Sequence, residues 1–319
     1  MRKLLTASAV TTVLLNASLA LAQTGPALLL KPLTEQTGTW ESRGDALILA
    51  DGDAGPGIDF DMSAFEYTGR FREQRERLIP RIGWDLTYYA FSSDLPIFDQ
   101  HLTDASIAAG IELGTYYEFQ AGFTAGVGYA GNAPFGETDA WYGKATLVAG
   151  RKLDEKTDLV VVVDYDGNRT FMPDVPLPGF AYRHQFDPTI TYTIGVPLTA
   201  VTWNPNPQTT VEATWTLLDS FDARVEYQLS PQWTVYGALQ RRLEAFSVDG
   251  LENHDRLIFE QRRAEMGLRW HPWEHTSLLL AGGYAFHGEF SVGFDTRDSD
   301  EIADLSDEPY VRFAFERRF

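Results

Sequence analysis

The sequence predicts an all-β fold, a transmembrane antiparallel up-and-down β-barrel of about 14 strands, because apolar and polar residues alternate along its C-terminal residues and along many segments before them. Within Tyr310–Phe319, one set of alternate residues is apolar and the other is charged: Val311, Phe313, Phe315 and Phe319 against Arg312, Glu316 and Arg318. Successive side chains of a strand point to opposite faces. This pattern is typical of a strand with lipid on one side and a wet lumen on the other.

The N-terminal residues predict export. Arg2 and Lys3 precede an apolar stretch, Leu4–Leu21, and Ala20-Leu21-Ala22 provides an A-x-A cleavage site before Gln23. We therefore expect residues 1–22 to be a signal peptide. The alternative is an N-terminal membrane anchor, which the many Ser, Thr and Asn residues of the stretch disfavour. After cleavage the net charge of −19 would become −21, since two cations are lost.

Composition narrows the possible partners. The chain has no cysteine, so neither disulfides nor thiol chemistry are expected. A strongly negative net charge argues against binding nucleic acid. After the signal segment, no run of apolar residues reaches the roughly 18 that a membrane helix needs.

Alternation recurs in the segments 117–130, 221–229, 257–271 and 276–290. A soluble β-sandwich would alternate too, with its apolar face inward. Two features favour the membrane barrel. The polar faces are rich in Gly, Thr and paired opposite charges, as a lumen is. The strand ends carry aromatic residues that are typical of interfacial girdles: Tyr117, Tyr129, Trp141, Trp233 and Trp270.

Turn-forming residues allow the strands to be counted. Short turns are expected at 72–77, 115–117, 152–156, 204–207, 230–232 and 272–275, and loops at 92–102, 131–138, 167–187, 218–220, 248–256 and 291–308. The segments between them make thirteen strands after residue 58. Bacterial barrels normally have even strand numbers, so a first strand at 44–50 brings the total to 14. The alternative of 12 holds if 208–229 is misassigned. Pro197 is expected to mark a bulge or an edge-like break within a strand at 188–203.

Three segments follow from this count. They are the signal peptide at 1–22, a periplasmic or lumen-inserted segment at 23–43, and the outer-membrane barrel at 44–319.

The candidate functional residues are charges expected on the lumen face. Opposite charges on neighbouring strands attract and brace a barrel wall. They can also form an eyelet whose transverse field orients a polar solute. The predicted set is Arg81, Asp85, Arg224, Glu226, Arg242, Glu244, Arg263, Glu265, Arg269, Glu289, Arg312 and Glu316, with Glu66, Arg70 and Lys144 as further candidates.

Motifs for other chemistry are missing from the sequence. The histidines do not have the spacing of a metal site, and no Gly-x-Ser-x-Gly elbow occurs. The acidic runs at 51–53 and 298–301 do not match a calcium-binding loop. We therefore predict no catalytic residue, no cofactor and no metal. A lipid hydrolase using Ser277 and His287 is kept as the least favoured alternative.

As a whole, the chain resembles uncharacterised, porin-like bacterial outer-membrane β-barrels. The resemblance implies that Phe313, Phe315 and Phe319 belong to the signal read by the barrel-assembly machinery, although Arg317 departs from the apolar pattern. It also implies outer-membrane lipid and lipopolysaccharide as partners. The expected function is a passive channel or transporter for small solutes. Its extracellular mouth would be acidic, since 291–308 holds seven acidic residues against Arg297. A plugged structural or surface-interaction barrel without conduction is the main alternative.

Overall fold

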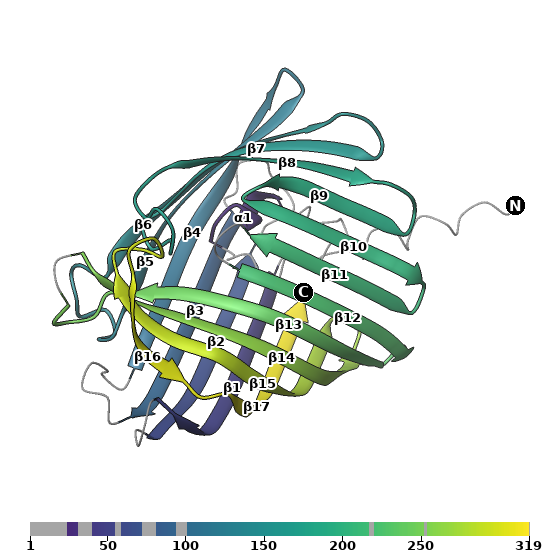
Figure 1. The fold of residues 1–319 in the computed structure, drawn as a ribbon. Helices are drawn as coiled ribbons and strands as arrows, with labels where there is room; N and C mark the ends of the chain where they lie inside the picture. Colours follow the sequence, from purple (N-terminus) through teal and green to yellow (C-terminus); the bar gives the residue numbers. More distant parts are fainter. Residues whose placement is uncertain are drawn as a thin grey trace, which may run out of the picture.

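The computed structural model describes residues 24–30, 40–54, 59–71, 81–93, 101–216, 220–251 and 254–318. These residues form one short helix, α1 (Ala27–Leu30), and one antiparallel sheet that closes on itself (Figure 1). Its strands are β1 (Trp40–Asp53), β2 (Asp59–Phe71), β3 (Arg81–Ser93), β4 (His101–Tyr116), β5 (Phe119–Gly131), β6 (Trp141–Lys152), β7 (Thr157–Asp166), β8 (Leu177–Gln185), β9 (Ile190–Val196), β10 (Leu198–Asn206), β11 (Thr209–Thr216), β12 (Ser220–Ser230), β13 (Trp233–Phe246), β14 (Arg256–Trp273), β15 (Thr276–Gly293), β16 (Asp300–Leu305) and β17 (Glu308–Arg318).

The ring closes between the first and last strands. β1 pairs with β2 on one side and with β17 on the other, from Glu41 opposite Arg318 to Leu49 opposite Tyr310. β16 and β17 both pair with β15, one after the other along its length, and so share one place in the wall. The barrel therefore has 16 strand positions. We call the rim that holds Glu41 and Arg318 the terminal rim, and the opposite one the loop rim.

The all-β barrel is confirmed, but both predicted strand numbers, 14 and 12, are wrong. The expected loop at 167–187 contains β8, and the expected strand at 188–203 is the hairpin of β9 and β10, which reverses at Pro197. Apolar and polar residues keep alternating through a turn as tight as this one. The pattern therefore does not show that the chain reverses at Pro197. The alternative of 12 strands treated the strand pair at 208–229 as misassigned, but this pair is present as β11 and β12.

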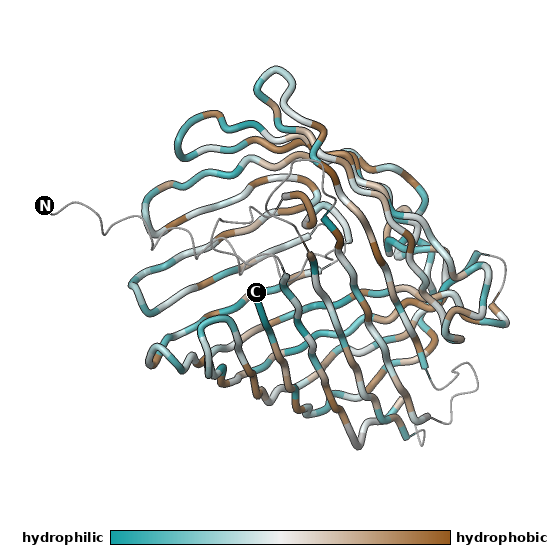
Figure 2. Tube along the Cα trace, turned by 180° about the vertical axis from the view of Figure 1, so that it is seen from behind, coloured by the Kyte–Doolittle hydropathy of each residue, from teal (hydrophilic) through white to brown (hydrophobic). Residues whose placement is uncertain are grey.

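The outside of the barrel is apolar. Each strand alternates between hydrophobic and hydrophilic residues along its trace (Figure 2), and large apolar side chains are exposed around the ring. Examples from successive strands are Ile48, Phe65, Ile107, Phe123, Leu147, Val161, Phe180, Ile194, Val201, Trp215, Val225, Leu239, Met266, Leu280 and Phe313. A belt of this extent would aggregate in water and is what lipid covers.

Aromatic side chains mark the terminal rim. Trp233 stacks on Trp270 with ring centroids 5.8 Å apart, and Trp40 lies 5.0 Å from Trp84. Such aromatic girdles lie at the boundary between lipid and water. Within the described ranges, no helix is long and apolar enough to cross a membrane.

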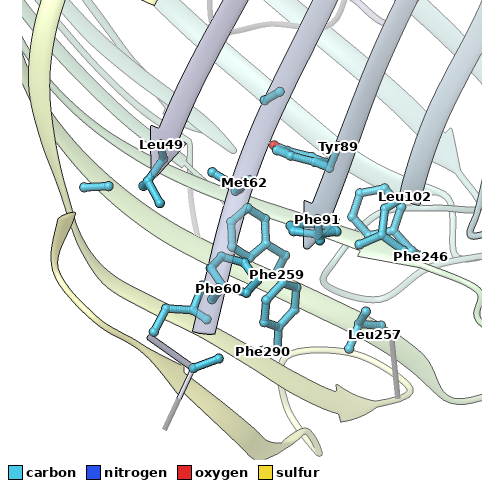
Figure 3. Packing of buried hydrophobic residues seen from close by; sticks show 14 of the residues in the cluster. Leu49, Phe60, Met62, Tyr89, Phe91, Leu102, Phe246, Leu257, Phe259 and Phe290 are labelled. Carbon is cyan, nitrogen blue, oxygen red and sulfur yellow. The ribbon is translucent and has the colours of Figure 1, made fainter. Parts of the chain in front are cut away.

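Near the loop rim the barrel interior holds an apolar cluster, which joins β1–β5 to β13–β17 (Figure 3). Phe259 stacks on Phe290 at 4.9 Å, and Tyr89 on β3 meets Phe259 on β14 at 5.4 Å. These strands belong to facing walls, so the apolar cluster fills the space between them.

A β-bulge corrects two expected orientations. If β15 alternated without interruption, Phe290 would point toward lipid and Glu289 into the lumen. The register between β14 and β15 shifts between Glu260 and Arg262, and His287 on the bulged strand has a positive φ of 48°. One extra residue inverts the faces beyond it. Phe290 therefore lies inside, and Glu289 lies opposite Glu260 on the outer face.

Candidate functional site

Arg312 is the centre of a buried polar network that connects the first and last strands. Its guanidinium pairs with Asp45 on β1 and with Glu265 on β14. Tyr236 and Tyr310 donate to the two oxygens of Glu265 at 2.9 and 3.0 Å. Sequence reasoning found Arg312 and Glu265 but missed Asp45 and both tyrosines, since aromatic residues had been assigned to the lipid face.

A second group of lumen charges connects strands that are not neighbours. Arg242 on β13 pairs with Glu66 on β2, and Glu244 lies 3.9 Å from the same guanidinium. Arg263 is 2% exposed and donates to Gln261 at 2.6 Å. The pair of Arg242 and Glu66 connects the same two walls as the apolar cluster does.

The third group lies toward the terminal rim. Arg269 donates to Glu226 at 2.8 Å, and Arg224 lies 3.9 Å from that carboxylate. Near the ends of the first and last strands, Glu316 pairs with Arg318, and Arg70 with Glu41 at 2.7 Å.

The remaining predicted charges lie on the wall formed by β3–β7. Lys144 pairs with Asp166 on β7 at 3.0 Å, whereas Arg81 and Asp85 contact the N-terminal residues. All predicted lumen charges except Glu289 thus lie in pairs or networks, an arrangement that braces a wall. A role in selecting solutes stays a prediction.

Two other expectations concern the ends of β15 and β17. Ser277 and His287 lie ten residues apart on one strand, a separation of about 33 Å, so they do not form a catalytic pair. Phe313 and Phe315 are exposed on the outer face, and Phe319 lies outside the described residues, so their part in an assembly signal stays a prediction. In the part of the chain that the structure describes, no group of three or more histidine and acidic side chains could hold a metal ion.

Opposite sides of the barrel meet at the loop rim. β5 and β13 lie eight positions apart in the ring, yet Gly131 and Ser247 form a β-bridge. The amide of Ser247 donates to the carbonyl of Ala130 at 2.9 Å. This contact narrows the barrel at one end.

A second contact between opposite sides joins the loop after β7 to the loop after β15. We call it the mouth latch, made of residues 168–172, Arg256 and residues 294–297. The amide of Thr296 donates to Thr170 O at 3.0 Å, and that of Met172 to Asp295 Oδ2 at 3.0 Å. Arg256 donates to Arg169 O at 3.0 Å and to Phe294 O at 2.7 Å. The latch crosses the loop-rim mouth.

Asp295 is the buried acid of the mouth latch. Its side chain has no solvent exposure, and Arg297 donates to both of its oxygens at 2.9 Å. Together with the Met172 amide, these hydrogen bonds hold the pKa of Asp295 below its usual value, although burial opposes them. Because the pKa is lowered, the carboxylate stabilises the latch above the ordinary pKa of aspartate, about 3.9, and this contribution is lost as pH falls through the lowered value.

We therefore expect acid to loosen the mouth latch. The Met172 amide should exchange its hydrogen faster below about pH 4, after correction for intrinsic rates. The measurement is hydrogen exchange across the pH range, with Asp295→Asn as the comparison. This variant should exchange faster at neutral pH and show a weaker pH dependence. An equally steep dependence in both proteins would contradict a role for Asp295.

A closed ring of strands with an apolar exterior, aromatic end girdles and a charged interior defines a bacterial outer-membrane β-barrel. The terminal rim then faces the periplasm and the loop rim faces outward, since the short turns lie on the periplasmic side of such barrels.

Solved barrels of the outer membrane have a similar architecture. The toluene transporter TodX of Pseudomonas putida is 11% identical, with 95% of this chain and 94% of that chain covered and a TM-score of 0.40. The COG4313 outer membrane channel of Pseudomonas putida F1 is 12% identical over 89% and 96%, with a TM-score of 0.36. Omp33 of Acinetobacter baumannii is 9% identical over 89% and 99%, with a TM-score of 0.35. No protein-family model matches the chain, and no curated protein matches it.

Proposed function

We propose that this barrel is an outer-membrane channel for small solutes whose outer mouth is closed at rest by the mouth latch. The single observation that carries the proposal is the composition of the latch. Hydrogen bonds connect its two loops to each other and Arg256 to both loops, so it can open without breaking any strand pair. Net hydrogen-bond contributions of about 1 kcal/mol each make such an opening accessible.

The inner wall away from the apolar cluster supports passage of solutes. On β7 to β10 the central lumen-facing residues are small or uncharged, and opposite charges pair toward the ends, as Asp158 does with Arg183 at 3.2 Å. The outer rim of β16 adds exposed acidic residues, Asp300, Glu301 and Asp304. An acidic mouth would raise the local concentration of cations, so cation selectivity belongs to this proposal.

The second candidate function is a structural barrel that does not conduct. The apolar cluster favours it, because Phe259, Phe290 and Tyr89 fill the lumen between two walls. The two candidates differ in what happens when the latch is broken.

The test is single-channel conductance in planar bilayers. Arg256→Ala removes the donor that joins both loops, and we expect open probability to rise several-fold. Thr170→Cys with Thr296→Cys should form a disulfide in a chain without other cysteines, silencing the channel when oxidised and restoring it when reduced. Arg262→Ala is the matched control, since Arg262 lies on the outer face of the same strand. If every variant is silent, the non-conducting barrel is correct.

A further inference from the structure

The chain's own N-terminal residues occupy a pocket on the inner wall. Residues 24–30, which include α1, lie within the ring of strands against β3, β4 and β5 (Figure 1). Thr24 has no solvent exposure and Leu28 is 1% exposed. We call the wall residues around them the segment pocket: Arg81, Asp85, Ser106, Gly110, Glu112 and Gly122.

One end of the segment pocket accepts hydrogen bonds. Asp85 Oδ2 accepts from the amide nitrogen of Thr24 at 3.0 Å and from its hydroxyl at 2.8 Å. The hydroxyls of Thr24 and Ser106 lie 2.9 Å apart. An amide, an ammonium or a hydroxyl group of any bound molecule would satisfy these groups equally well.

The other end of the segment pocket donates hydrogen bonds. Arg81 Nη1 donates to the main-chain oxygens of Leu28 and Leu29 at 3.3 and 3.1 Å, and Glu112 pairs with the same guanidinium. A guanidinium held in this way binds carbonyl and carboxylate oxygens. The pocket thus recognises main-chain atoms at both ends.

Two glycines form an apolar seat between these ends. A Cβ atom added to Gly110 would lie 3.3 Å from Leu29 Cδ2, and one added to Gly122 would lie 3.1 Å from Leu29 Cδ1. The missing side chains therefore create the space that a leucine occupies. The wall fits an apolar side chain at this level.

We propose that the segment pocket is a binding site for short apolar peptides, and that residues 24–30 occupy it as a tethered, exchangeable competitor. Asp85 and Arg81 are four residues apart on one strand, or about 13 Å. An extended peptide covers roughly 3.3–3.6 Å per residue, so about four residues bridge the two ends. This proposal specifies which solutes the proposed channel would carry, and its physiological role rests on that channel function.

Tethering explains why the segment can hold its place and still exchange. A segment that belongs to the same chain as its pocket is present there at an effective concentration of roughly millimolar order. Few contacts then suffice to keep the pocket occupied, and a free peptide competes when its concentration is comparable. Weak binding is also what passage requires, since a solute that enters a channel must leave it.

The test measures binding to the full-length protein in detergent micelles. The probe is a C-terminally dye-labelled heptapeptide, Thr-Gly-Pro-Ala-Leu-Leu-Leu, followed by fluorescence anisotropy. Leu28→Asp acts on the tethered segment and leaves the wall intact, so the probe should bind this variant at least tenfold more tightly than it binds the unmodified protein. A probe with its three leucines replaced by aspartate should not bind.

Two further variants act on the segment pocket itself. In the Leu28→Asp protein, Gly122→Val fills the apolar seat and should weaken binding at least tenfold. Gly150→Val on β6 is the matched control, because a Cβ there meets its nearest neighbour, Val160 Cγ2, only at 3.8 Å. Thr24→Cys with Ser106→Cys should exclude the probe when oxidised and admit it when reduced.

Two results would overturn the assignment. Absence of saturable binding to the Leu28→Asp protein would make residues 24–30 a fixed structural element. Binding that Gly122→Val and Gly150→Val affect equally would place the probe elsewhere. Neither result depends on conductance, so a silent barrel that binds the probe would reject the channel and leave the pocket standing.

Discussion

Replacing Arg312 by alanine is expected to lower the free energy of unfolding by about 3–5 kcal/mol. The substitution leaves Glu265, a buried carboxylate that is 6% exposed, without its cation. It also removes one of the two arginines that pair with the buried Asp45, which keeps Arg43. Removing one partner of a buried pair costs far more than the pair itself contributes, because the remaining charge stays desolvated. Because Arg312 connects β17 to β1 and β14, the effect should fall on closure of the barrel.

The measurement is urea unfolding in lipid vesicles, followed by tryptophan fluorescence and by the heat-dependent shift in gel mobility. Arg183→Ala is the comparison, since Arg183 and Asp158 are each about one-third exposed and such pairs contribute about 1 kcal/mol or less. Replacing Glu265 and Arg312 together by apolar residues should recover most of the loss, because Asp45 keeps its pair with Arg43. Equal losses for Arg312→Ala and Arg183→Ala would contradict the proposed importance of the network.

Phe259→Ala is expected to have an effect of similar size, about 3–5 kcal/mol. Phe259 is fully buried between Phe290 and Tyr89, so truncation leaves a cavity enclosed by facing walls. Phe65→Ala is the matched control, because Phe65 is 44% exposed on the outer face, where lipid chains can fill the space left behind. The same unfolding assay compares them, and a loss for Phe65→Ala as large as for Phe259→Ala would argue against a tightly packed interior cluster.

Alternation predicted local orientation well, as long as the strand was regular. On β17, Val311, Phe313 and Phe315 are exposed on the outer face while Arg312 is buried, as the period of two requires. The same rule failed on β15 beyond His287, because one extra residue in a bulge exchanges the two faces. It also failed at Pro197, where a tight reversal preserves the alternation that a single strand would show.

The class of the protein can be predicted from local patterns along the chain. Alternating faces, aromatic strand ends and an interleaved set of lumen charges depend only on neighbours along the chain, and they are sufficient to predict a membrane barrel and most of its inward-facing charges. The contents of the lumen, in contrast, depend on contacts between residues that are distant in the sequence. The bridge between Gly131 and Ser247, the mouth latch, the apolar cluster and the segment pocket all join residues from separate strands or loops. Such contacts form because the closed ring brings residues that are distant in the sequence close together in space. The local alternation of residues carries no information about which distant residues will meet.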